Sequence, residues 1–382
     1  MTSGQPTPAP SWAIVTQRAR YRLMPRARWL SEVPVIGVAI ILFAVCIALL
    51  ISKGIMPDLD GVLVNLRLFG LFIVLIAAID AGMQLARYRP QSPVEHLKKR
   101  YFSAPARRIA VSGAPMLAIA IVLLPYFSKM KAAIPLFNAY TWDNAFIAWD
   151  RAIFFGLDAW IVLQPVLGFP IITAFLALLY QLWFALLYPG VLFFAFARIN
   201  HGVRRQFFLT YVLSWTLIGG LMATLLASVG PCFVGPLLGS PAFDAQMAYL
   251  NAADEQVPVM TLPVQAMLLE WYGAAENGLG SGITAMPSMH CAIAFLYWLA
   301  MRRISARWGV FFAVFFFITW ISSVHLAYHY AVDGLVSLVA VAMLWKASDV
   351  TITAWDRWLE RRGGVIATLQ PPALRTNTAP AE

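Results

Sequence analysis

The sequence predicts an all-α membrane protein, a polytopic bundle of about eight transmembrane helices. Of its 382 residues, 60% are hydrophobic and 12% are charged, about half the charged share of a soluble domain. The apolar residues form long uncharged runs, each close to the roughly 20 residues that a helix needs to cross hydrocarbon. The basic residues lie between these runs, almost all on one predicted side. This composition excludes an ordinary water-soluble enzyme and a disordered chain.

Eight apolar stretches account for the predicted spans. The sixth is shorter than the others, and its first turn can lie in a cavity rather than in lipid. No internal repeat is visible. The stretches cover residues 33–51, 62–80, 109–126, 170–197, 207–229, 287–301, 308–324 and 330–346.

The distribution of Lys and Arg predicts the orientation. If the N-terminus is cytoplasmic, the cytoplasmic segments hold 23 of the 28 basic residues, the opposite side holds 4, and Arg67 lies within the second stretch. This asymmetry predicts an even number of spans with both ends inside. It also explains the net charge of +10 without nucleic acid, so we expect membrane lipids as partners.

Composition also suggests how the chain is divided. Residues 1–32 read as a disordered, basic, cytoplasmic N-terminus, and residues 33–108 as two transmembrane helices with a basic loop. Residues 109–346 hold the other six spans, and residues 347–382 form a cytoplasmic tail. The Ala- and Arg-rich composition, with no targeting signal, favours a bacterial inner membrane.

Two segments on the outer side are long. Residues 138–155 mix aromatic side chains with Asp143, Asp150 and Arg151, a pattern that fits an interfacial helix and an ordinary aromatic-rich loop equally well. Residues 230–286 contain five acids and no Lys or Arg. We expect this second segment to fold over the membrane surface as a lid.

Three of the five histidines fall at the outer ends of the last three stretches, at His290, His325 and His329. Asp333 follows His329 by four residues, so both side chains share one face of a helix. A carboxylate there can accept the imidazole N–H and stabilise the charged ring. The alternative is that Asp333 only satisfies a polar pocket between helices.

A second polar element precedes the sixth stretch. Pro287 suits the first position of a helix, whose free N–H groups favour an anion, and Ser288 adds a hydroxyl there. His290 follows within the first turn. Taken alone, the pattern also fits a plain proline-started helix with a histidine reaching towards water. Its combination with His329 and Asp333, two spans later and on the same side, favours a shared site.

These residues resemble a known family. Residues 287–290 resemble the P-S-x-H motif of the type 2 phosphatidic acid phosphatase superfamily, and residues 329–333 resemble its H-x-x-x-D motif. Residues 150–156 resemble the D-x-x-L-F-G segment of the branch that contains inositol phosphorylceramide synthases, which are inositolphosphotransferases. The resemblance implies a six-helix phosphatase-like core over residues 109–346, preceded by two additional helices.

The sequence departs from the family at its phosphate-binding cations. Typical members carry K-x6-R-P after the third core span, where residues 228–233 read S-V-G-P-C-F. They also carry S-R shortly before the nucleophilic histidine, where this chain has Ser322 and Ser323. A protonated His325, or Arg151, is a candidate substitute. The alternative for Arg151 is an interfacial residue that only meets lipid headgroups.

The resemblance implies phosphoryl transfer in two steps without a metal or cofactor. His329 would form a phosphohistidine supported by Asp333, while His290 would act as general acid and then general base, with Ser288, His325 and Arg151 binding substrate. Water as acceptor would make the protein a lipid phosphatase, and an alcohol such as inositol would make it a lipid phosphotransferase. The site would face the periplasm.

Two other functions remain open from the sequence. Ionisable residues in spans also occur in proton-coupled lipid transporters or flippases, although here they cluster near one membrane face. The missing cations also fit a catalytically inactive scaffold of the same fold. The lipid donor, the acceptor and the oligomeric state are left open.

Overall fold

The computed structural model describes residues 25–57, 59–273 and 280–362, and every regular element within these ranges is a helix. Seven of these helices are long and apolar enough to cross a membrane, so the predicted polytopic helical bundle is confirmed. They are α1 (Pro25–Ser52), α2 (Leu59–Tyr88), α4 (Ala104–Phe137), α7 (Pro170–Phe196), the composite of α8 (His201–Leu213), η2 (Ser214–Met222) and α9 (Ala223–Leu225), α14 (Ala306–His325) and α15 (Ala331–Arg361).

The sixth predicted span, residues 287–301, is a shorter helix, α13 (Met289–Met301), of 13 residues. Eleven of these residues are buried, which is typical of an apolar helix enclosed by other helices. Its most extensive packing is against α14, and it also contacts α7, α8 and η2. Because protein surrounds it, α13 does not need the length of a helix that crosses lipid alone.

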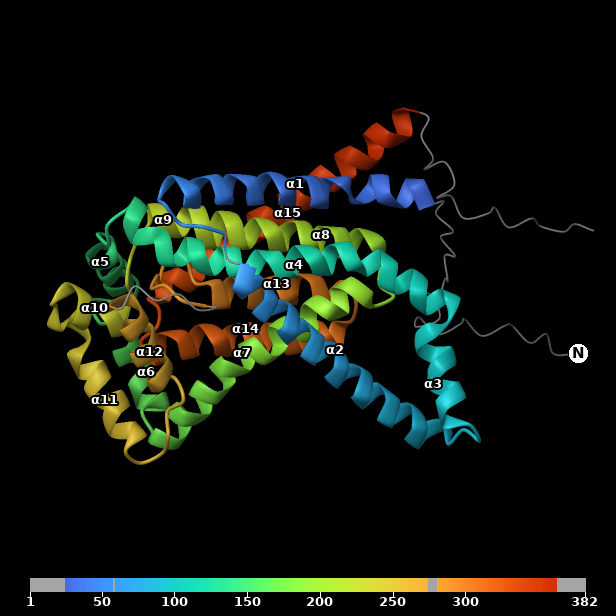
Figure 1. Cartoon of the computed structure of the whole chain (residues 1–382). Helices are drawn as coiled ribbons and strands as arrows, with labels where there is room; N and C mark the ends of the chain where they lie inside the picture. The colour runs from blue at the N-terminus through green and yellow to red at the C-terminus, as the bar shows by residue number, and fades with distance from the viewer. Residues whose placement is uncertain (1–24, 58, 274–279, 363–382) are drawn as a thin grey trace, which may run out of the picture. The chain divides into compact units, whose positions relative to one another are not determined.

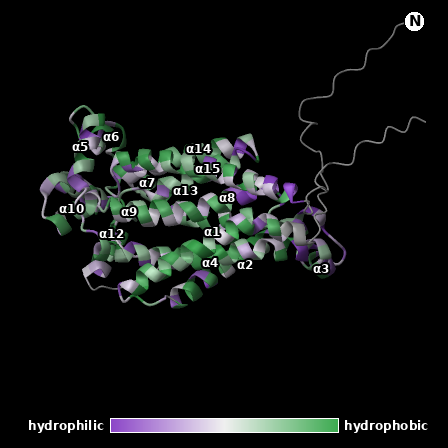
Figure 2. Ribbon diagram, turned by 90° about the horizontal axis from the view of Figure 1, so that it is seen from above, coloured by the Kyte–Doolittle hydropathy of each residue, from purple (hydrophilic) through white to green (hydrophobic). Residues whose placement is uncertain are grey.

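The two helices ahead of the predicted core expose most of their apolar surface. Only 17% of the apolar window of α1 and 11% of that of α2 is buried, against 61% for His201–Leu225. Apolar residues cover the long helices (Figure 2). Exposed apolar surface of this extent fits contact with lipid.

A buried amide fixes α2 to the bundle. Asn65 is fully buried and donates to the carbonyl oxygens of Ala120 (3.3 Å) and Ile121 (2.8 Å) on α4. Its own amide oxygen accepts the hydroxyl of Tyr188 on α7 at 3.0 Å. Asn65 therefore sets the position of α2 against both helices.

Short helices gather at one end of the long ones, away from α3 (Pro93–Phe102) (Figure 1). They come from the two long outer segments of the sequence. The first segment forms α5 (Asp143–Ile153) and α6 (Ala159–Leu167), and the second forms α10 (Pro231–Leu238), η3 (Pro241–Phe243), α11 (Asp244–Asp254) and α12 (Leu262–Gly273).

The chain divides into two compact units, one of residues 34–352 and one of residues 1–33 with 353–382. In the described part of the smaller unit, Trp355 stacks on Trp358 and donates its indole N–H to the carbonyl of Leu30 at 2.8 Å. The larger unit contains all the residues of the site described below.

The ends of the chain differ in part from the sequence prediction. Residues 1–24 and 363–382, where disorder is predicted, lie outside the described residues. However, α1 begins at Pro25, within the predicted disordered segment, and α15 continues to Arg361 rather than ending near Lys346. Apolar runs indicate only the part of a helix that faces lipid or core, so polar helical ends were missed.

Replacement of Asn65 tests the attachment of α2. Asn65→Leu removes three hydrogen bonds within the bundle, and interhelical hydrogen bonds in membrane proteins contribute about 0.6–1.7 kcal/mol. We expect the melting temperature of the purified protein in detergent to fall by several degrees. Leu66→Ala, at an exposed position of the same helix, is the control. Equal melting temperatures for the two variants would contradict a stabilising role of Asn65.

Candidate functional site

The loop between α14 and α15 presents His329. The N–H groups of Tyr328 and His329 both donate to the carbonyl of Ser323, at 3.0 and 3.1 Å, and Ala327 adopts a positive φ of 61°. These contacts close the chain tightly between the two helices. The His329 side chain is therefore held at the start of α15.

A buried carboxylate orients the His329 ring. Nδ1 of His329 lies 3.0 Å from Oδ2 of Asp333, and the same oxygen accepts the N–H of Tyr330 at 3.1 Å. Asp333 is fully buried. An ionised carboxylate only accepts hydrogen bonds, so Nδ1 carries the hydrogen and Nε2 keeps its lone pair. Nε2 is the nitrogen left available to a substrate.

Two carboxylates on α5 hold the start of α15 from outside the span. Oδ2 and Oδ1 of Asp150 accept the N–H groups of Ala331 (2.7 Å) and Val332 (2.9 Å). Oδ1 of Asp143 accepts the Tyr330 hydroxyl at 2.7 Å. Together they fix the backbone on the C-terminal side of His329.

The environment of Asp150 shifts its pKa. The pKa of Asp150 is raised to about 6, mainly because the carboxyl group is buried and in smaller part because the carboxylates of Asp333 and Asp158 are near. The N–H groups that it accepts lower its pKa, but they offset only part of this effect. Burial therefore disfavours the ionised form of Asp150, the form that accepts both N–H groups of α15.

His290 lies in the first turn of α13. Ser288 is the N-cap, and its hydroxyl accepts the N–H of Cys291 at 3.4 Å. The Ser337 hydroxyl donates both to the carbonyl of Ser288 (2.9 Å) and to that of Asp333 (2.7 Å). This shared donor links the start of α13 to the first turns of α15.

Aromatic rings enclose the His290 side chain. The ring of Tyr180 stacks on it at a centroid distance of 4.4 Å, and Trp183 lies at 4.3 Å. Nε2 of His290 has no hydrogen-bond partner among the described residues. The centroids of the His290 and His329 rings are 6.4 Å apart, which leaves room for one small group between them.

Both histidines line one cavity of about 400 Å³. Its wall is mostly aromatic and aliphatic, and it is formed by α4, α7, α12, η2 and the loop before α13, with Leu68 contributed by α2. Lys131 is the only Lys or Arg among the described residues that line it. The cavity therefore combines an apolar wall with a small polar region, as ligand sites generally do.

A nine-residue π-helix, η2, forms part of this wall, where the sequence predicted one continuous span over residues 207–229. Trp215 lines the cavity from η2. Gly219 lies so close to the Phe127 ring and the Met289 sulfur that a Cβ atom would clash with both. Such π-helical turns are frequent at functional sites, and this one packs beside the residue that precedes His290.

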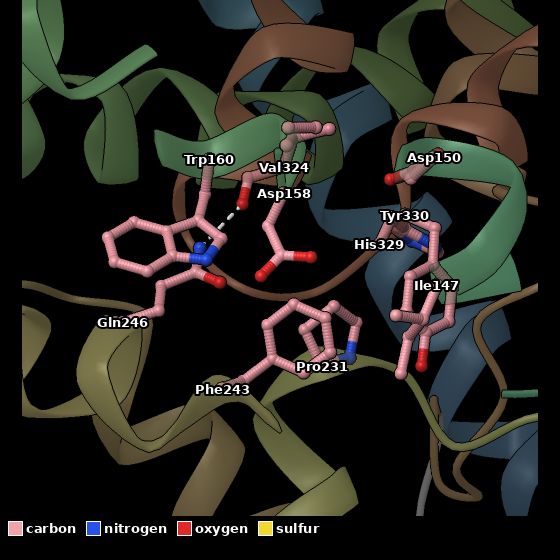
Figure 3. A pocket seen from close by; sticks show the side chains of 11 residues that line it. Ile147, Asp150, Asp158, Trp160, Pro231, Phe243, Gln246, Val324, His329 and Tyr330 are labelled. Carbon is pink, nitrogen blue, oxygen red and sulfur yellow. Dashed lines mark hydrogen bonds between the residues drawn. The ribbon is translucent and has the colours of Figure 1, made fainter. Parts of the chain in front are cut away.

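A second, much smaller pocket touches His329 from the side of α5 and α6. Figure 3 shows Asp150, Asp158 and Trp160 around it. The side-chain amide of Gln246 donates a hydrogen bond to the carbonyl of Val324 there. Of the described residues, His329 alone lines both cavities.

The structure brings three of the predicted site residues together, whereas the three others do not line the cavity. His290, His329 and Asp333 converge, whereas Ser288 is buried as a helix cap and does not line the cavity. His325 is buried elsewhere, with Nε2 2.9 Å from the Thr173 hydroxyl. Arg151 is exposed and paired with Asp158 at 2.7 Å. Neither lines the cavity.

Sequence reasoning missed Lys131 and the positioning role of the acids on α5. Asp143 and Asp150 are seven residues apart, so they share one helix face, and this face also carries Phe146 and Ile147, which are buried. The spacing was a usable signal for a buried acidic pair. No local pattern marks Lys131, because its neighbours across the cavity come from distant parts of the chain.

The described residues contain no group of three or more His, Cys, Asp and Glu side chains that could hold a metal ion. Cys46, Cys232 and Cys291 are free thiols.

Comparison with known proteins gives one match. The family model of the PAP2 superfamily matches residues 144–347, more than half of the chain, and this range includes His290, His329 and Asp333. No curated protein and no solved structure matches significantly. Lys131 lies outside the matched range.

Ionisation of Asp150 opposes folding, and this can be measured. Its pKa in the folded protein, about 6, exceeds the ordinary value of 3.8, so the folded state binds the proton more tightly. Stability is therefore lost as pH rises from about 4 to about 6. Asp150→Asn does not titrate, so we expect its melting temperature to rise relative to that of the unsubstituted protein across this interval.

The experiment compares melting temperatures in detergent at pH values on both sides of the interval. Asp244→Asn, which replaces an exposed acid of α11, is the matched control. A difference between Asp150→Asn and the unsubstituted protein that stays constant with pH would contradict a raised pKa at Asp150.

Proposed function

The chain belongs to the PAP2 superfamily, and on that premise we propose that it is a membrane enzyme that transfers a phosphoryl group, or a phosphorylated headgroup, from a lipid through a phosphohistidine. One observation carries the proposal. Two histidines, one in the first turn of α13 and one in the loop before α15, line one cavity with ring centroids 6.4 Å apart, and a buried carboxylate holds Nδ1 of the second. A nucleophile and an acid–base group in this relation suit two-step transfer.

In the first step, Nε2 of His329 attacks phosphorus. The P–N bond forms as the bond from phosphorus to the leaving oxygen breaks, and His290 gives its proton to that oxygen. Asp333 stabilises the positive charge that develops on the His329 ring. The rings of Tyr180 and Trp183 pack against the His290 ring and hold it in place beside His329.

In the second step, His290 accepts a proton from the incoming hydroxyl. The hydroxyl oxygen attacks phosphorus, the P–N bond breaks, and the electron pair returns to Nε2 of His329. The chemistry is complete with these groups and needs neither a metal nor a cofactor. Water as acceptor gives a phosphatase, whereas an alcohol gives a phosphotransferase.

The character of the cavity supports a lipid substrate, and two sequence features bear on the membrane side and the acceptor. The cavity is mostly apolar, with its two histidines at the start of α13 and in the loop before α15, so tails and a headgroup phosphate can be accommodated together. The 23-to-4 division of basic residues favours a site on the periplasmic side of a bacterial inner membrane. The similarity of residues 150–156 to inositol phosphorylceramide synthases favours an alcohol such as inositol as the acceptor.

Kinetics of single substitutions distinguish the roles of the two histidines. His329→Ala should abolish turnover of a lipid phosphate and of nitrophenyl phosphate alike, because no phosphoenzyme forms. His290→Ala should lower turnover of the lipid by about 10²–10⁴-fold, the usual contribution of a general acid–base group. It should still release about one equivalent of nitrophenolate in a burst, since that group leaves without a proton.

His201→Ala, at the start of α8 and outside the cavity, is the control for both assays and should behave as the unsubstituted protein. A burst that survives in His329→Ala and is lost in His290→Ala would reverse the two roles. Unchanged rates in both variants, on lipid and nitrophenyl esters, would contradict the enzyme assignment.

A further inference from the structure

A phosphoryl group inside this cavity lacks an obvious counter-charge. The matching positions of the family motifs carry no cation in this chain, and Arg151 and His325 do not line the cavity. A phosphate that leaves water for a mostly apolar site needs compensating positive charge. His329 and Asp333 together supply little net charge, because they form a mutual ion pair when the ring is protonated.

We propose that Lys131 binds the phosphoryl oxygens of the substrate, assisted by the hydroxyl groups of Tyr180 and Thr284. The inference rests on the proposed function and deepens it, because it names the group that neutralises the transferred phosphate. Lys131 is half-buried and lines the same cavity as His290 and His329. Among the described residues it forms no ion pair within 4.0 Å, so its charge is not neutralised by a carboxylate.

The two hydroxyl groups provide an independent observation. Oη of Tyr180 and Oγ1 of Thr284 are inaccessible to solvent and have no hydrogen-bond partner among the described residues, although both residues line the cavity. Buried polar atoms are seldom left without a partner. Phosphate oxygens would satisfy both as donors, in the same space that Lys131 borders.

The backbone around Lys131 is held in place. Ser128, one turn earlier on α4, accepts the N–H of Gly280 at 2.8 Å. Gly282, with φ of 87°, lies directly against the backbone of Lys131 and Ala132, where a Cβ atom would have no room. The loop before α13 thus packs on this turn of α4 and connects it to the segment that carries Thr284.

The assignment explains why the family motifs are incomplete here. Lys131 comes from α4, outside the range 144–347 that matches the family. A cation on α4 makes a cation at residues 228–233 or at Ser323 unnecessary. The lysine on α4 and the nucleophile in the loop before α15 then approach the phosphate from different parts of the fold, which restricts its orientation.

Binding to an inactive background isolates this role from turnover. In the His329→Ala protein, binding of dioctanoylglycerol phosphate, inorganic phosphate and uncharged dioctanoylglycerol is followed by titration calorimetry in detergent. Lys131→Met should raise the Kd of both phosphate ligands about 10- to 100-fold, as expected for loss of a charge-assisted hydrogen bond. The Kd of dioctanoylglycerol should stay within about twofold, which also shows that the variant is folded.

Two further variants complete the comparison. Lys131→Arg keeps the charge, so its Kd for both phosphate ligands should stay well below that of Lys131→Met. Lys129→Met removes a neighbouring lysine that does not line the cavity and should bind like the background protein. Weaker binding of the lipid phosphate alone would show that Lys131 binds the phosphate only as part of a lipid headgroup. Weaker binding of both ligands would show that Lys131 recognises phosphate itself.

Phosphate binding by Lys131→Met equal to that by Lys129→Met would overturn the inference. If Lys131→Met also loses dioctanoylglycerol binding, the comparison is made between Lys131→Gln, which lacks the charge, and Lys131→Arg, which keeps it. Equal phosphate binding by these two variants would contradict the role of charge. Failure of the proposed function can be distinguished from failure of this inference. If phosphate binding depends on Lys131 but the protein with His329 intact forms no phosphoenzyme, the role of Lys131 stands and phosphoryl transfer through His329 is refuted.

Discussion

The buried pair of His329 and Asp333 is the interaction on which the rest of the site depends. A carboxylate that is removed from water needs compensating partners. Oδ2 of Asp333 has two, the His329 ring and the Tyr330 N–H, whereas Oδ1 has none among the described residues. The pairing sets the direction of Nε2. Contacts with neighbouring helices then hold the chain around this pair. On α5, Asp150 accepts the Ala331 N–H and Asp143 accepts the Tyr330 hydroxyl. The Ser337 hydroxyl connects the carbonyl of Asp333 to the start of α13.

The bundle places this polar pair beside an apolar cavity. Helix α13 is short and enclosed, so it begins inside the protein. His290, in its first turn, therefore faces the cavity and not lipid. Each wall comes from a different part of the chain, including Leu68 of the additional helix α2. Two helices ahead of the family-matched region, α2 and α4, therefore contribute to the wall of the cavity.

Much of this arrangement could be predicted from the sequence. Hydropathy identified the apolar segments, because hydrocarbon requires long uncharged helices. The spacing of His329 and Asp333 predicted their contact, although His329 lies in the loop before α15 and not on the helix itself. The shortness of α13 was visible in the sequence, but its burial was not. The π-helix η2 and the neighbours of Lys131 depend on which helices pack together, and periodicity carries no information about that. Arg151 drew attention as a lone outer arginine, yet in the structure it pairs locally with Asp158.

The position of phosphorylation on His329 tests the central claim most directly. Nδ1 is engaged by Asp333, so the phosphoryl group must be carried on Nε2. The His290→Ala protein is incubated with a phosphate ester, quenched at alkaline pH, and analysed by mass spectrometry with antibodies that distinguish the two phosphohistidine isomers. The account predicts Nε2-phosphohistidine at residue 329. Phosphate on Nδ1 of His329, or on another residue, would contradict it.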